Sequence, residues 1–344
     1  MKFFYDEVRG KRMRRLFIIL PILNLLILLH PYSGFPMEKN SEKFILEKDL
    51  SIGIDIGDEN LMFGNISDID LDTKENIYVL DWKNSRIQKF DSQGNFLKSV
   101  KIGKGEGPSE VTRILSMAVT EKGKIYVLGD NRKIVVFDED GDFLLSFKID
   151  SDGRHIISDS EENAVVLGLK DGQILHVYSQ EGNYLRSFGK EFEIPSKYSQ
   201  YKEMPYIKIP MKIDGAKSKK IFILDPHRYE IVYYQNNQFA GSILGKNKAF
   251  SPLMITKAIP QGIGIIYPVV SVFEHESRFY VNIRASKQLV GGIPNQLDIF
   301  ENDEQIATLD VNGLAYAIDR QGRLYFAEEE DFPMVVRYIV SIRN

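Results

Sequence analysis

One pattern of hydrophobic and polar positions recurs along this chain about every 40 to 60 residues. Its centre is a run of four or five apolar residues between polar turns, clearest at 76–81 (NIYVLD) and 124–130 (KIYVLGD). Weaker copies follow, and the second residue of the motif falls at positions 77, 125, 164, 221, 279 and 324. A short apolar run bounded by turn residues is typical of a buried strand. The pattern therefore predicts six related strands.

Each copy of the motif stands in a frame that indicates four short strands. In the first copy these are residues 66–70, 77–80, 87–90 and 96–102. The later copies carry matching third and fourth runs, at 134–137 and 143–149, 174–178 and 184–188, 230–234 and 239–244, and 296–300 and 305–309. Repeats of this length with four strands each predict an all-β fold, a six-bladed β-propeller with four-stranded antiparallel blades.

The turns between these runs share a composition. An acidic or hydroxyl residue starts the turn and glycine stands at its fourth position, at 91–94, 138–141, 179–182 and 319–322. Asp and Ser side chains hold such turns through backbone amides, and glycine accepts the positive φ that a tight hairpin requires. The turn chemistry thus agrees with a meander of antiparallel strands.

The last repeat ends early. After the run 334–340 only four residues remain, so the sixth unit has no outermost strand of its own. The segment 44–54 belongs to no unit and has the composition of a strand. We expect this N-terminal segment to supply the missing strand and close the ring, which removes open strand edges. The chain has no cysteine, so closure must rely on packing and hydrogen bonds.

The first 33 residues form a different kind of segment. Six basic and two acidic residues precede an apolar run of 14 residues at 16–29. Such a run has the length of a signal-peptide core and is short for a membrane span. No good cleavage site follows it, so the alternative of an uncleaved membrane anchor remains open. We therefore expect a signal peptide or N-terminal membrane anchor at 1–33, a linker at 34–43 and the propeller at 44–344.

The basic residues before the apolar run predict that the rest of the chain lies across the membrane. The expected location is exported: periplasmic, at the cell surface, or membrane-anchored and facing outward. Without the six basic and two acidic residues of 1–33, the net charge falls from −4 to −8. Nucleic acid is bound through concentrated Lys and Arg, so this charge disfavours a nucleic-acid partner. Membrane contact is expected only through the N-terminal segment.

Residues 81–91 (DWKNSRIQKFD), followed by Gly94, resemble an NHL repeat. The loop 103–110 (GKGEGPSE) is similar to one that is frequent in bacterial six-bladed β-propeller proteins with NHL-like repeats. The resemblance extends over roughly residues 44–342. It implies a fold and an exported location. The wider class includes binding modules, lactonases and lyases, so the fold does not assign an activity.

Propeller geometry indicates where a partner would bind. In each blade the loop between strands two and three opens on the same face as the connection to the next blade. The longest irregular segments, 190–206, 245–268 and 284–295, share this face with 81–86 and 103–110. Long irregular loops are uncommon unless they are functional or disordered. We call this surface the loop-rich face and expect it to carry the binding site.

Acidic and basic residues recur at equivalent loop positions of this face in three blades. Together with the single Trp and one His they form the candidate binding residues: Asp81, Trp82, Asn84, Arg86, Asp130, Arg132, His227 and Arg228. An exposed Trp can stack on a sugar or an aromatic group. The alternative is structural, because Asp can hold a turn through backbone amides and Arg can pair with a neighbouring acid.

The sequence offers little evidence for chemistry. Five histidines (30, 155, 176, 227 and 275) are scattered without metal-binding spacing, and 103–108 lacks the Gly-Lys-Ser/Thr ending of a phosphate loop. We predict no catalytic residues, no metal and no cofactor, and a binding or scaffold propeller for a protein, peptide or glycan of the cell envelope.

The alternative is a metal-dependent, lactonase-like hydrolase or lyase that acts at the central channel. It would require zinc held by convergent histidines, or calcium held by residues such as Glu110, Asp130, Asn282 and Glu328.

Overall fold

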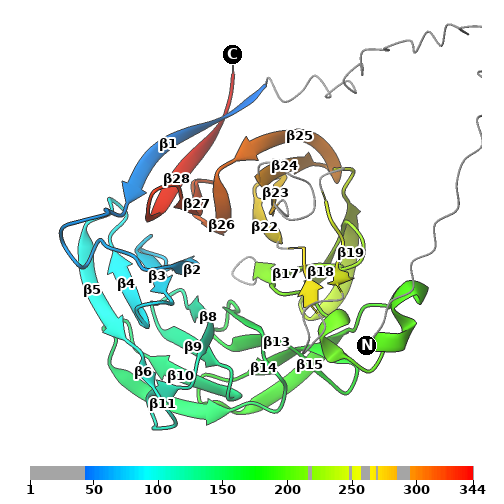
Figure 1. Ribbon diagram of the computed structural model, residues 1–344, viewed down its shortest axis with the longest axis horizontal. Helices are drawn as coiled ribbons and strands as arrows, with labels where there is room; N and C mark the ends of the chain where they lie inside the picture. The colour runs from blue at the N-terminus through cyan, green and yellow to red at the C-terminus, as the bar shows by residue number, and fades with distance from the viewer. Residues whose placement is uncertain are drawn as a thin grey trace, which may run out of the picture. The chain divides into compact units, whose positions relative to one another are not determined.

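A computed structural model describes residues 43–215, 219–247, 250–256, 264–268, 270–284 and 295–343. These residues form six four-stranded blades around a central channel (Figure 1), which confirms the expected all-β propeller. The segment 1–33, interpreted as a signal peptide or anchor, lies outside the described residues, as does the linker 34–43 except for its last position. Within the described ranges, no helix is long and apolar enough to span a membrane.

Each blade is antiparallel, and in blades 1 to 5 the strands follow chain order from the channel outward, whereas the outermost strand of blade 6 is β1. The strands of blades 1 to 3 are β2 (Ile66–Leu71), β3 (Ile77–Asp81), β4 (Arg86–Phe90), β5 (Phe96–Lys101); β8 (Ile114–Val119), β9 (Ile125–Gly129), β10 (Lys133–Phe137), β11 (Phe143–Lys148); β12 (His155–Ser158), β13 (Ala164–Lys170), β14 (Gln173–Tyr178), β15 (Tyr184–Lys190). Those of blades 4 to 6 are β16 (Asp214–Gly215), β17 (Lys220–Leu224), β18 (Glu230–Gln235), β19 (Gln238–Leu244); β22 (Val270–His275), β23 (Arg278–Ile283), β24 (Asn295–Glu301), β25 (Glu304–Val311); β26 (Gly313–Ile318), β27 (Leu324–Glu329), β28 (Pro333–Ile342) and β1 (Phe44–Ile52).

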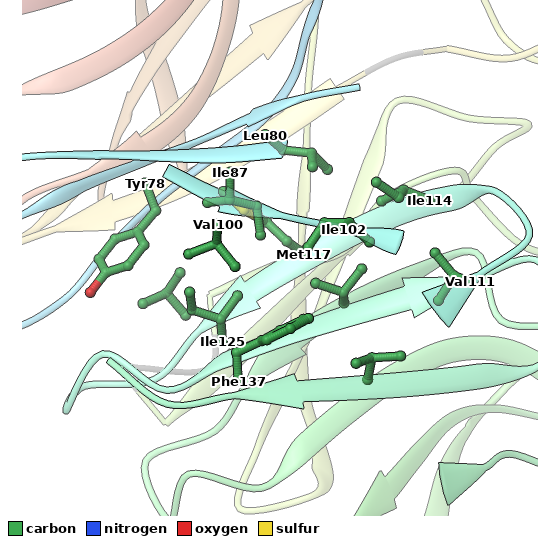
Figure 2. Close-up of a cluster of buried hydrophobic side chains, with 13 residues drawn as sticks. Tyr78, Leu80, Ile87, Val100, Ile102, Val111, Ile114, Met117, Ile125 and Phe137 are labelled. Atoms are coloured by element: carbon green, nitrogen blue, oxygen red, sulfur yellow. The ribbon is translucent and has the colours of Figure 1, made fainter. Parts of the chain in front are cut away.

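The repeated motif occupies the second strand of every blade: β3, β9, β13, β17, β23 and β27. All five residues of β3 and of β9 are buried, because each blade packs against a neighbour on both faces. Figure 2 shows such a layer between blades 1 and 2, where Leu80 and Ile87 meet Met117 and Ile125. The core is thus divided into layers between successive blades, and each fully buried aliphatic side chain contributes about 1.5 to 3 kcal/mol.

The turns have the conformation that their composition predicts. Gly94 has a φ of +85°, and the Asp91 carboxylate accepts hydrogen bonds from the backbone N–H groups of Gln93 (2.9 Å) and Asn95 (2.8 Å). Any residue with a side chain would be strained at position 94. The positive φ therefore explains the glycine.

The N-terminal strand closes the ring as expected. β1 pairs antiparallel with β28 along its length, from Phe44 opposite Ile342 to Ile52 opposite Val335, and becomes the outermost strand of blade 6. The Arg337 guanidinium on β28 donates to both carboxylate oxygens of Asp49 on β1, at 2.9 Å each. It also donates to the Ser92 carbonyl of blade 1 at 2.8 Å. Blade 6 is thus joined both to the N-terminal strand and to the first blade.

Two of the three long irregular segments contain regular structure. Residues 190–206 include the 3-10 helix η1 (Ser196–Tyr201) and the start of η2 (Pro205–Ile207), and 245–268 includes a hairpin of β20 (Met254–Thr256) and β21 (Gly264–Ile266). The loop after blade 1 contains a short parallel ladder of β6 (Gly103–Lys104) and β7 (Glu110–Val111). In the third segment, residues 285–294 lie outside the described part of the chain.

Deleting residues 44–52 tests the role of β1. We expect the variant to melt at a lower temperature and to aggregate, because β28 becomes an exposed edge and Arg337 loses both bonds to Asp49. Differential scanning calorimetry and light scattering on the full chain and the deletion would measure this. An unchanged melting temperature would show that the ring does not depend on the strand.

Candidate functional site

The loop-rich face bears a cap, which we define as the described residues of 190–213 and 250–268. The cap has a small hydrophobic core of its own, in which Tyr198, Ile207 and Leu253 are buried. The Tyr198 hydroxyl donates to the Leu253 carbonyl at 3.0 Å, so the two segments are joined by a hydrogen bond as well as by packing. The long segments therefore form an ordered layer on this face.

Arg154, which precedes the first strand of blade 3, holds the outer part of the cap. Its guanidinium lies 4.5 Å from the ring centre of Tyr206 and 5.1 Å from that of Tyr267, and it donates to the Tyr267 hydroxyl at 3.1 Å. That hydroxyl donates in turn to the Tyr206 carbonyl at 2.6 Å. Tyr206 nevertheless remains 44% exposed and Met211 41% exposed. The cap thus presents apolar side chains on a fixed support.

The candidates of blade 1 surround Asp81, which is fully buried. Its carboxylate accepts hydrogen bonds from the backbone N–H of Gly64 and Asn65, from the Asn84 amide (2.7 Å) and from the Arg86 guanidinium (3.1 Å). This network ties the turn to the loop that precedes blade 1. Trp82 stands apart from it and is 46% exposed.

The blade 2 candidates do not pair with each other. Asp130 accepts hydrogen bonds from Thr112 and, at 3.0 Å, from the Arg113 guanidinium, and these contacts hold the pKa of its carboxyl below the usual value. Arg132 pairs instead with Asp152 at 2.6 Å, on the connection to blade 3. Both side chains thus join neighbouring loops.

The blade 4 candidates contact the cap and their own turn. His227 Nε2 lies 2.8 Å from the Ile207 carbonyl, and burial lowers the pKa of its imidazole. Arg228 donates to Asp225 at 3.0 Å, although its side chain is 69% exposed. The structure therefore distributes the eight candidates over three blades, and their hydrogen bonds support the turns of each blade. Trp82, Arg132 and Arg228 are the ones that present large exposed side chains.

A second cluster of polar residues, none of them among the eight candidates, lies in the central channel. A cavity of about 330 Å³ is lined by the first strands of the blades and by the turns that follow them. Lining residues in those turns include Thr73, Glu121 and Arg320. These turns connect first to second strands, so the cavity opens on the face opposite the loop-rich face.

The deep end of this cavity contains a buried ammonium group. Lys212, the residue two positions before β16, forms an ion pair with Asp214 at 3.0 Å and donates to the Ser271 hydroxyl at 3.1 Å. Its Nζ lies 4.9 Å from the centre of the Tyr316 ring. Burial would lower the pKa of Lys212, but the carboxylates of Asp214 and Asp68 outweigh this and raise it. Lys212 is therefore charged, and it links blades 4, 5 and 6.

Asp68 and His155 face each other across the same end. The Asp68 carboxyl accepts hydrogen bonds from the Ser116 hydroxyl (3.1 Å) and the Met117 N–H (3.2 Å). Burial raises its pKa to about 7, although the charge of Lys212 opposes the shift. His155 Nε2 lies 3.9 Å from Asp68 Oδ2, and burial, assisted by Lys212, holds the pKa of the imidazole well below its ordinary value. At neutral pH the imidazole is thus uncharged.

The residues nominated for a metal do not converge in the structure. The Glu110 carboxylate accepts the Gly107 N–H at 2.9 Å, the buried Asn282 carbonyl oxygen accepts the Ala315 N–H at 2.8 Å, and Glu328 accepts the Tyr338 hydroxyl at 2.8 Å. Asp130 is engaged on blade 2 as described above. Among the residues that the structure describes, no group of three or more His, Cys, Asp or Glu side chains could hold a metal ion.

One sequence signal points toward the channel cluster. In the first strand of blade 1, Asp68 and Asp70 alternate with Ile69 and Leu71. A buried polar residue in an inner strand indicates either a blade-to-blade bond or a site. Which of the two applies depends on residues from other blades, and the sequence does not show those contacts.

A family model described as 6-bladed beta-propeller (DUF5128) matches residues 56–239. This match spans more than half of the chain, which therefore belongs to that family of 6-bladed β-propellers. It does not test the NHL resemblance, which stays a prediction. No curated protein matches the chain.

Solved structures agree on the fold. A protein from Bacteroides fragilis to which export is provisionally assigned has a TM-score of 0.57 at 13% identity, covering 90% of this chain and 98% of its own. A DUF4221 member from Bacteroides vulgatus has a TM-score of 0.54 at 10% identity, with 88% and 99% coverage. A streptogramin B lyase has a TM-score of 0.52 at 13% identity, with 88% and 100% coverage. At these identities the likeness shows the fold alone.

Asp68→Asn tests the electrostatics of the channel. Because the folded-state pKa of Asp68 is raised from 3.8 to about 7, the folded protein keeps a proton that the unfolded chain loses. Wild-type stability should therefore fall as the pH rises from about 4 to 7, whereas the amide of the variant does not titrate. The free energy of unfolding of Asp68→Asn, taken relative to that of wild type, should therefore rise by a few kcal/mol over this pH window. Chemical unfolding at pH 5 and pH 8 measures the change, and a pH-independent difference would contradict it.

Asp81→Ala tests the structural role of the blade 1 candidates. Four hydrogen bonds to a fully buried carboxylate are lost, so the free energy of unfolding should fall by about 2 to 4 kcal/mol. The matched control is Asp130→Ala, which removes a partly exposed pair and should cost about 0 to 1 kcal/mol. Urea unfolding of both variants compares them. An equal loss of unfolding free energy in the two variants would show that the buried network does not stabilise the turn.

Proposed function

We propose that this protein is an exported, non-catalytic binding propeller that docks a protein or peptide of the cell envelope on its loop-rich face. The observation that carries the proposal is the cap, where Tyr206 and Met211 are exposed although the segment around them is ordered and has its own core. Apolar side chains that gather on one exposed surface mark a surface that a partner can cover.

The chemistry of the cap favours a protein or peptide partner. Tyr, Met and Arg are enriched at protein interfaces, and Tyr and Arg are frequent among the residues that contribute most to binding. Tyr206 is held by the Arg154 guanidinium and by the Tyr267 hydroxyl, so little side-chain freedom would be lost on binding. The exposed Trp82 and Arg228 lie on other blades of the same face and would extend the contact.

Export is supported by the sequence of residues 1–33, with its basic start and its apolar run of 14 residues. The provisional assignment of export to the structurally similar B. fragilis protein agrees with it. Membrane contact would come through the N-terminal segment. The resemblance to NHL repeats supports an exported binding propeller in the same way.

A binding role fits the chemistry of the two sites better than catalysis does. The candidate acids and bases of the loop-rich face are engaged in turn networks such as that around Asp81. In the channel, Lys212 is neutralised by Asp214 and the nominated calcium ligands lie apart. We therefore propose no cofactor for the docking function.

Site-specific photocrosslinking tests the docking surface. A photoreactive phenylalanine analogue replaces Tyr206 in the full chain, expressed in its native cells, and the matched control carries it at Phe143, which is 41% exposed on the outer strand β11. We expect adducts with one or few envelope proteins from position 206 and none from position 143. Equal adducts from both positions, or none from position 206, would overturn the proposed surface.

A further inference from the structure

We propose that the central channel is a second binding site, which takes a small, neutral ligand rich in hydroxyl groups, such as a sugar or another polyol. The site is separate from the loop-rich face, because its cavity is lined by the inner strands and by the turns that open on the opposite face. It does not depend on the proposed docking function.

The imidazole of His155 is the strongest sign of a missing partner. Its Nδ1 is buried and has no hydrogen-bond partner, and its Nε2 is 3.9 Å from Asp68 Oδ2, which is too long for a direct hydrogen bond. Buried polar atoms in folded proteins nearly always have a partner. His155 lines the cavity, so a ligand hydroxyl placed there can bond to the imidazole and to the Asp68 carboxyl together.

The charges around the cavity favour a neutral ligand. Lys212 is already engaged by Asp214 and Ser271, so it offers no unbalanced positive charge for an anion. An anion would also meet the carboxylates of the lining, among them Asp68 and Glu121. Four further lining carboxylates are already paired with cationic side chains and offer little net charge to a cation: Asp214 with Lys212, Glu274 with Lys220, and Glu75 and Asp319 with Arg323. A cation that enters as far as Asp68 would be repelled by the Lys212 ammonium, whose charge acts on the Asp68 carboxyl. Hydroxyl groups can donate and accept, and they match this mixture of groups without adding charge.

Size and shape agree with a small ligand. The cavity volume of about 330 Å³ lies at the lower end of the range for small-molecule sites. Its wall combines apolar side chains, among them Ile69, Phe273 and Ala317, with a few convergent polar groups. Apolar walls contact the C–H faces of a sugar ring while the polar groups bind its hydroxyls, which is the usual composition of such sites.

Saturation-transfer NMR with the full chain tests the proposal. The protein is purified in a detergent without a sugar headgroup, and the probes are glucose, galactose, N-acetylglucosamine and myo-inositol, with citrate and choline as charged probes. We expect saturation transfer from the protein to at least one neutral probe, which should bind with a Kd of about 10 mM or tighter. Binding should weaken about tenfold or more in His155→Phe, which keeps a ring at this position but removes both nitrogens.

Two further variants keep the test decisive. Asp68→Asn preserves the size of the side chain and should weaken binding even if His155→Phe fails to fold. Asp140→Asn makes the same substitution as Asp68→Asn on an exposed turn of blade 2 and should bind the neutral probe as wild type does. The proposal is overturned if no neutral probe binds, if only citrate or choline binds, or if the folded channel variants bind the neutral probe as well as wild type.

Discussion

The closure of the ring by β1 is the constraint on which the rest of this structure depends. Every layer of the core lies between two blades, so each blade needs two neighbours, and an open ring would leave two faces without one. Closure is achieved by a strand from the opposite end of the chain, held by the ladder with β28 and by the Arg337 pair with Asp49. No disulfide can assist it, because the chain has no cysteine.

The channel adds polar bonds to this closure. Asp68 and Asp70 on the first strand of blade 1 accept backbone N–H groups of blade 2, and Asp214 does the same between blades 4 and 5. Asn282 joins blade 5 to blade 6. Such bonds satisfy backbone groups at the inner edge, where no further strand is available. The inner polar residues thus stabilise the ring, and the space between them forms the cavity.

The cap and the channel are connected through two segments of chain. Residues 205–213 pass from η2, which contains the exposed Tyr206, into the channel, where Lys212 lies among blades 4, 5 and 6. Arg154 of the cap support is likewise followed directly by His155 of the channel. The proposed docking surface and the proposed ligand site therefore share their supporting backbone on two sides, although they open on opposite faces.

Much of the fold could be predicted, because its information is local. The apolar run of each second strand, the Asp and Gly turns and the strand at 44–54 are each encoded within a few residues, and their repetition defines the number of blades. The location of the loop-rich face could be predicted from the order of strands and loops along the chain alone. Its candidate residues are spread over three blades, where Asp81 bonds to Arg86 in its own turn and Arg132 bonds to Asp152 on the connection to blade 3.

The sequence by itself thus determined the repeat, the strands, the turns and the closing segment, since these depend on periodicity and on backbone preferences. The tertiary structure alone decided where polar groups converge. Asp68, His155, Lys212 and Tyr316 come from different blades, and they meet because the ring places the first strand of each blade around one axis. Burial at that axis then changes their protonation, raising the pKa of Asp68 and lowering that of His155. The spacing of residues along the chain does not encode that environment.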